Sequence, residues 1–69
     1  MEISKTKEVL INGLSLILEK KDLILLIALM LKTEAQMETM IAWIHLFQKE
    51  NPDEDRVIRI AQQIVKQIT

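Results

Sequence analysis

His45 is the only histidine in this 69-residue chain, and it is therefore the first candidate for catalysis or metal binding. Two ligands on one helix must be three or four residues apart to reach a single ion. Glu38 lies on the same helix face but seven residues earlier, a rise of about 10 Å that prevents shared coordination within one chain. A metal shared across a symmetric dimer is the remaining alternative. We interpret His45 as a polar residue at the edge of a helix face, and we expect no metal or cofactor.

Three consecutive acidic residues, Asp53, Glu54 and Asp55, resemble a catalytic carboxylate cluster. They follow Asn51-Pro52, however, and acidic residues are favoured in the first turn of a helix because of the helix dipole. The chain has one glycine, which excludes a phosphate-binding loop, and no serine lies in a nucleophile-elbow motif. The absence of cysteine excludes disulfides and thiolate metal sites. We therefore expect no catalytic residues and no enzymatic activity.

A basic stripe on the C-terminal segment is the third candidate, and it consists of Arg56, Arg59 and Lys66. It could contact phosphates or an acidic partner, and a small DNA-binding regulator is the alternative function that we consider. Nine basic and ten acidic residues give a net charge of −1, so the basic excess typical of nucleic-acid binders is absent. In a helix-turn-helix arrangement the recognition helix would carry Glu34 and Glu38 toward the phosphates. A solvated helix face is the favoured interpretation.

Nine consecutive apolar residues, Leu23 to Leu31, form the most unusual segment. A helix that is apolar all round must be surrounded by protein or lipid. A chain of this size buries only about 60% of its surface on folding, although 49% of its residues are hydrophobic. Nine residues are too few to span a bilayer, which requires about 20. We expect a second copy or another protein to cover this segment. A peripheral membrane role is a further alternative, and cytoplasmic localisation is the expectation.

The scarcity of glycine and proline and the helical period of the apolar residues predict an all-α fold. Ser4, Asp22 and Asn51 are the predicted N-caps of the first, second and fourth helices. Thr33 and Gln36 form a capping-box pattern that predicts a new helix there. No glycine or proline marks a turn at that point, so a single long helix from Leu23 to Glu50 is the alternative, and we favour a corner. The predicted helices are Ser4–Lys20, Leu23–Lys32, Glu34–Glu50 and Pro52–Ile68.

Each predicted helix except the second has a defined apolar face. Gly13 weakens the first helix by up to about 1 kcal/mol, or it permits close approach of another helix. Trp43 and Phe47, one turn apart, either stack in the core or anchor an interface. Met30, Met37 and Met40 are interpreted as core residues. The predicted core faces are Leu10, Ile11, Leu14, Ile17 and Leu18; Met37, Met40, Ile41, Ile44 and Phe47; and Val57, Ile60, Ala61, Ile64, Val65 and Ile68.

The sequence thus predicts a single helical domain, residues 1–69, of three or four short antiparallel helices that form a bundle completed by dimerisation, with the second helix at the centre. A symmetric dimer is the usual assembly for a lone small chain. We expect a small non-catalytic regulatory or adaptor protein that acts through protein–protein contacts of a hydrophobic helix face. The predicted interface residues are Leu25, Leu29, Trp43, Leu46 and Phe47.

Overall fold

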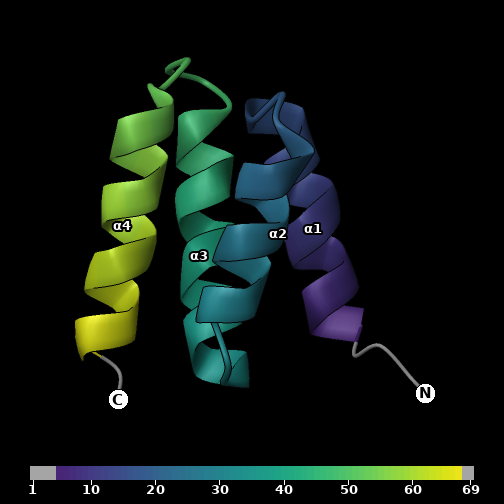
Figure 1. Ribbon diagram of the computed structural model, residues 1–69, viewed down its shortest axis with the longest axis vertical. Coiled ribbons are helices and arrows are strands. Elements are labelled where there is room, and N and C mark those ends of the chain that lie inside the picture. Colours follow the sequence, from purple (N-terminus) through teal and green to yellow (C-terminus); the bar gives the residue numbers. More distant parts are fainter. Residues whose placement is uncertain (1–4, 68–69) are drawn as a thin grey trace.

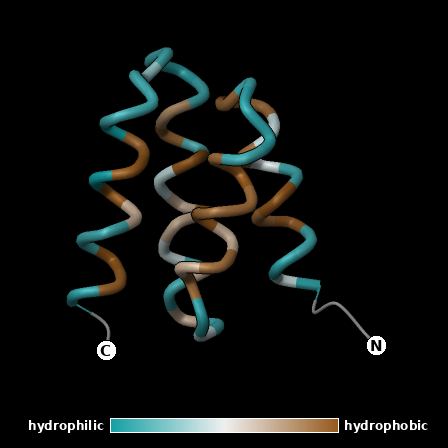
Figure 2. Tube along the Cα trace, viewed as in Figure 1, coloured by the Kyte–Doolittle hydropathy of each residue, from teal (hydrophilic) through white to brown (hydrophobic). Residues whose placement is uncertain are grey.

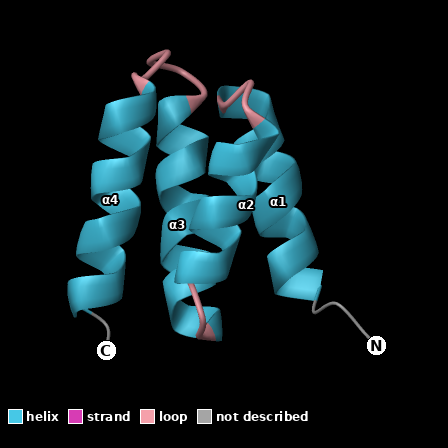
Figure 3. Ribbon diagram, viewed as in Figure 1, coloured by secondary structure: helices cyan, strands magenta, loops and turns pink. Residues whose placement is uncertain are grey.

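The computed structural model describes residues 5–67 and contains four α-helices (Figures 1 and 3). Their order and bounds are α1 Lys5–Ile17, α2 Lys21–Met30, α3 Glu34–Phe47 and α4 Glu54–Gln67. The all-α prediction is confirmed, with four helices rather than three. The predicted cap Ser4 and core residue Ile68 lie outside the described residues.

Consecutive helices run in opposite directions, as predicted (Figure 1). The packing order differs from the chain order, because α1 packs against α2 and α3, and α4 packs against α3 and α2. The four helices therefore close a ring in the order α1, α3, α4, α2. In this ring α1 and α3 are parallel neighbours. Within the single chain α2 is one side of the ring and not its centre, and its outer face points away from the bundle; the central position expected for it in a dimer stays a prediction.

A sharp corner joins α2 and α3, as the capping-box pattern predicts. The Thr33 Oγ1 atom accepts a hydrogen bond from the Gln36 N–H at 3.2 Å. The Gln36 Oε1 atom accepts from the Thr33 N–H at 3.2 Å and the Lys32 N–H at 2.9 Å. This arrangement satisfies backbone donors that a helix start otherwise leaves unpaired. Gln36 is buried for this reason, and the single long helix is excluded.

Two other predicted caps are wrong. The N-cap of α2 is Lys20, which makes no side-chain capping bond, and Asp22 lies in the first turn of the helix instead. Asn51 has φ 52°, in the left-handed region, and its N–H donates to the Phe47 carbonyl at 3.2 Å. Asn51 therefore ends α3 rather than starting α4, since asparagine tolerates the left-handed conformation common after a helix. As a result α4 begins at Glu54, two residues later than predicted.

The core lies inside the ring and is built from every helix, largely as the apolar faces predict. Gly13 of α1 lies against Ile44 of α3, and a Cβ atom at Gly13 would be 3.2 Å from the Ile44 Cγ2 atom. Glycine here permits the close approach of these two helices, at the cost of some helix propensity. The core residues are Leu10, Leu14, Leu18, Ile24, Ile27, Leu31, Met37, Met40, Ile44, Phe47, Val57, Ala61 and Ile64.

Candidate functional site

The apolar segment from Leu23 to Leu31 has one buried face and one exposed face. Its inner face is buried by the other helices and consists of Ile24, Ile27, Ala28 and Leu31. Leu23 and Met30 are half-buried at its edges. The chain therefore shields only part of this segment by itself. It leaves the rest uncovered.

The uncovered part is a set of three leucines on the outer face of α2, which we call the leucine surface. Leu29 is 68% exposed, Leu25 55% and Leu26 47%. At 3.6 residues per turn these three side chains fall within an arc of about 100° and adjoin one another. The segment is hydrophobic along its whole length (Figure 2). A contiguous apolar surface of this kind is more informative than single exposed hydrophobic residues.

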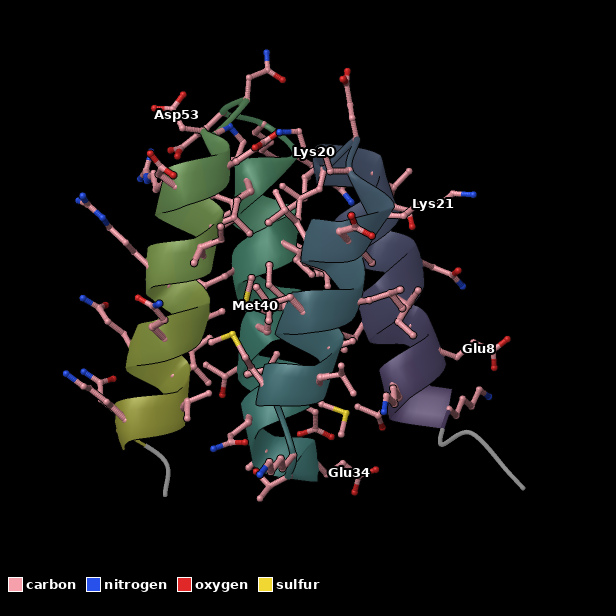
Figure 4. The ribbon with its side chains drawn as sticks, in the orientation of Figure 1. Glu8, Lys20, Lys21, Glu34, Met40 and Asp53 are labelled. Carbon is pink, nitrogen blue, oxygen red and sulfur yellow. The ribbon has the colours of Figure 1, made fainter. Side chains whose placement is uncertain are left out.

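Charged residues lie at both ends of the leucine surface. Lys20, Lys21 and Asp22 are at the start of α2, and Lys32 and Glu34 follow its end. All five are exposed. Lys20 and Lys21 lie at the upper end of the molecule and Glu34 at the lower end (Figure 4). The apolar surface is thus bounded along the helix axis by charges of both signs.

The other predicted interface residues are not part of this surface. Leu46, on α3, is 57% exposed, whereas Trp43 is half-buried. Phe47 is 1% exposed, and its ring centroid lies 5.8 Å from that of Trp43. The structure therefore places Phe47 in the core, and Phe47 is not available as an interface residue. Leu46 lies on α3, which is not a neighbour of α2 in the ring, so it is not part of the leucine surface.

Three exposed hydrophobic residues were missed by sequence reasoning: Leu26 on α2, and Val9 and Leu16 on α1. Val9 and Leu16 line a shallow apolar groove between α1 and α3, with a volume of about 240 Å³. Their seven-residue spacing, two turns of one helix face, was a signal that could have found them. Asn12 lies between them and also lines the groove, so they do not form a continuous apolar strip.

The chemically suggestive residues remain dispersed. His45 is exposed on α3 and lines the same groove between α1 and α3. Within residues 5–67, no three His, Asp or Glu side chains gather closely enough to hold a metal ion. The acidic residues Asp53, Glu54 and Asp55 are all exposed at the start of α4, and a Glu54 carboxylate oxygen lies 3.9 Å from the Lys20 Nζ atom. Glu54 and Asp55 are first-turn residues of α4, and Asp53 immediately precedes the helix.

The basic residues of α4 are exposed but not equivalent. Arg56 lies 3.6 Å from a Glu50 carboxylate oxygen, and its guanidinium carbon is 5.5 Å from the centre of the Phe47 ring. Both contacts occupy Arg56 within the chain. Arg59 and Lys66 lie beside Met30 of α2 around an open depression. The stripe therefore includes one residue already engaged by an acid and an aromatic ring.

Comparisons with known proteins add no relative: no family model, no curated protein and no solved structure matches this chain significantly. Across residues 5–67, none of the helices has the length and apolar character needed to cross a bilayer.

Proposed function

We propose that this protein is a small non-catalytic regulator or adaptor that binds another polypeptide through the leucine surface. The observation that carries this proposal is the exposure of Leu25, Leu26 and Leu29 side by side on one helix. Each leucine of such a surface favours burial by about 25 cal/mol per Å² of apolar area. Contiguous apolar surfaces rimmed by polar residues commonly mark protein interaction sites.

The leucine surface is preferred to the other exposed hydrophobic residues because of its continuity. Leu46 is a single exposed leucine on α3, and Asn12 separates Leu16 from Val9 on α1. Isolated exposed hydrophobic residues of this kind are normal on protein surfaces. The surface is also held on a regular helix packed on its inner side by Ile24 and Ile27. A rigid element loses little conformational entropy when a partner binds, which favours affinity.

The DNA-binding alternative gains no specific support. The three basic residues lie on α4, and Arg56 is engaged by Glu50 and Phe47. An electrophoretic mobility shift with random-sequence duplex DNA at low salt tests the DNA-binding alternative. Retardation that disappears as salt rises is the result that would favour DNA binding over the present proposal.

The experiment that tests the proposal is site-specific photocrosslinking in the native host. A benzophenone amino acid at position 29 is expected to give discrete crosslinked protein products. The same group at Gln62, an exposed residue of α4, is the matched control and should give none. Position 46 tests the separate prediction for Leu46. If position 29 yields no product beyond the control, the leucine surface is not a docking site.

A further inference from the structure

We infer that the occupant of the leucine surface is a second copy of this chain, bound with the two α2 helices antiparallel about a two-fold axis. This inference rests on the proposed function, because it names the partner of the same surface. It is carried by the order of charges along α2 and the segment that follows it. A symmetric interface requires a surface to be complementary to itself, and the charges that flank the leucine surface favour one orientation.

The apolar part of the surface is self-complementary in the antiparallel orientation. With the axis near Ile27, Leu25 of one copy lies opposite Leu29 of the other, and Leu26 packs between them. The six leucines of the two copies would then form one layer along about five residues, or about 6 Å, of helix. Each leucine is at least 47% exposed in the single chain. Pairing therefore removes from water the side-chain area that folding leaves uncovered.

The charges at the two ends favour the same orientation. Asp22 precedes the leucines by one turn, and Lys32 follows them. In the antiparallel pair Asp22 of each copy lies opposite Lys32 of the other, and Lys21 lies close to Glu34 of the other. A parallel pair would instead place Asp22 against Asp22 and Lys32 against Lys32. Like charges at short range oppose association, so the charge order favours the antiparallel arrangement over the parallel one.

Asp22 and Lys32 are exposed, whereas the Glu34 carboxylate already accepts a hydrogen bond from the Thr6 hydroxyl at 2.9 Å. Lys32 is held in place by its backbone N–H, which donates to the Gln36 Oε1 atom at 2.9 Å, so its side chain can be changed without removing that bond. The two charged ends of this face lie at opposite ends of the bundle, as the labelled Lys21 and Glu34 show (Figure 4). In a second bundle related by a two-fold axis, the end of α2 lies beside the start of α2 in the first bundle, and the reverse holds at the other end.

The first test is the mass of the purified chain by sedimentation equilibrium, from about 10 μM to about 1 mM. We expect a monomer–dimer equilibrium, since an interface of one short helix is at the small end of the size range. Leu29→Glu should raise the dimer Kd by at least about 30-fold, the effect of a central interface residue. Leu16→Glu is the matched control, because Leu16 is 72% exposed on α1, and it should leave the Kd unchanged. Thermal melts verify that both variants fold.

The second test is charge reversal. Asp22→Lys and Lys32→Asp should each raise the Kd by about 2- to 30-fold, because each ion pair occurs twice. The double variant should restore the wild-type Kd, because the two charges exchange places across the axis. Asp55→Lys provides the control: like Asp22, Asp55 is an exposed first-turn acid, but it lies on α4.

A disulfide experiment fixes the orientation, since the natural chain has no cysteine. In the antiparallel dimer the two copies of position 22 are about 15 Å apart along the axis, beyond the Cα separation of about 7 Å that a disulfide allows. Asp22→Cys mixed with Lys32→Cys should therefore form a mixed disulfide, and Asp22→Cys alone should not. A disulfide formed by Asp22→Cys alone would overturn the antiparallel arrangement.

Failure of the inference is distinguishable from failure of the proposed function. A chain that is monomeric at about 1 mM overturns the second-copy inference. If position 29 nevertheless crosslinks to a different protein in the host, docking through the leucine surface stands with another partner. If the monomer instead floats with vesicles of anionic phospholipid, and Leu29→Glu abolishes flotation, the surface binds membranes and both proposals fail.

Discussion

The helices α2 and α4 contribute to the same core but present very different outer faces. Both bury aliphatic side chains in the bundle, Ile24 and Ile27 from α2 and Val57 and Ile64 from α4. The outer face of α4 carries Arg59, Gln62, Gln63 and Lys66, whereas that of α2 carries three leucines. Along α4 hydrophobic and hydrophilic residues alternate, and along α2 they do not (Figure 2). Folding explains the inner faces of both helices but gives no reason for the outer face of α2.

The difference indicates which residues serve the fold and which serve something else. Replacing the outer leucines by polar residues would give α2 the amphipathic pattern of α4 without removing any core contact. A surface that is not needed for folding and that exposes apolar area to water is a candidate for binding. Four predictions test this comparison: two concern the faces of α2, one the faces of α4 and one the corner between α2 and α3.

The largest effect is expected on the inner face of α2. Ile27 is fully buried, so Ile27→Ala should lower the free energy of unfolding by about 2–5 kcal/mol through lost burial and a residual cavity. Urea denaturation at low protein concentration measures this loss. Leu29→Ala, on the outer face of the same helix, is the control and should cost far less. Equal losses for the two variants would show that the faces are not separable.

The second prediction concerns the inner face of α4. Val57 is fully buried, and Val57→Ala removes two methyl groups, so a loss of about 2 kcal/mol in unfolding free energy is expected. The change Arg59→Ala on the outer face should stay within about 0.5 kcal/mol of the wild type. The same denaturation series measures both. A small loss at Val57 would mean that α4 is not docked as firmly as α2.

The third prediction addresses the corner that sets the direction of α2. Thr33→Ala removes the hydroxyl that accepts from the Gln36 N–H, and it should lower the unfolding free energy by about 1 kcal/mol. Thr33→Ser should retain most of the stability. Thr39 is a suitable comparison, because its hydroxyl bonds only to the Ala35 carbonyl within α3, and Thr39→Ala should not destabilise. A neutral Thr33→Ala would show that the corner is held by packing alone.

The smallest effect on stability is expected on the outer face of α2. Leu29→Gln should change the free energy of unfolding by no more than about 0.5 kcal/mol, measured where the chain is monomeric. The reverse exchange on α4, Gln62→Leu, should be equally neutral for folding. A marked destabilisation by Leu29→Gln in the monomer would assign this leucine to the fold rather than to binding.

Much of the fold could be predicted from the sequence because helical periodicity and capping are local. The Thr33–Gln36 pattern located the start of α3, and the buried positions of α4 agree with its apolar face. Asn51 was misassigned because asparagine suits two positions, the N-cap of one helix and the left-handed end of another. Asp22 was misassigned because an acid favours both the cap and the first turn. Which of the two positions such a residue occupies depends on the path of the chain between the helices.

The candidate site could be predicted only in part. Leu25 and Leu29 were identified from the apolar segment, but within that segment no periodic pattern distinguishes the inner face from the outer one. Phe47 was assigned both to a core face and to an interface, and the packing of α3 against α4 settled it, with Arg56 over its ring.

The sequence by itself determined that this chain forms short helices and that one of them is apolar all round, because helix formation and amphipathicity depend on residues within a few turns. Only the tertiary structure decided that α1 and α3 are neighbours, with Gly13 against Ile44, and that Leu25, Leu26 and Leu29 remain in water. The physical reason is that burial is a property of the assembled ring: a leucine becomes core or surface according to which helices pack beside it.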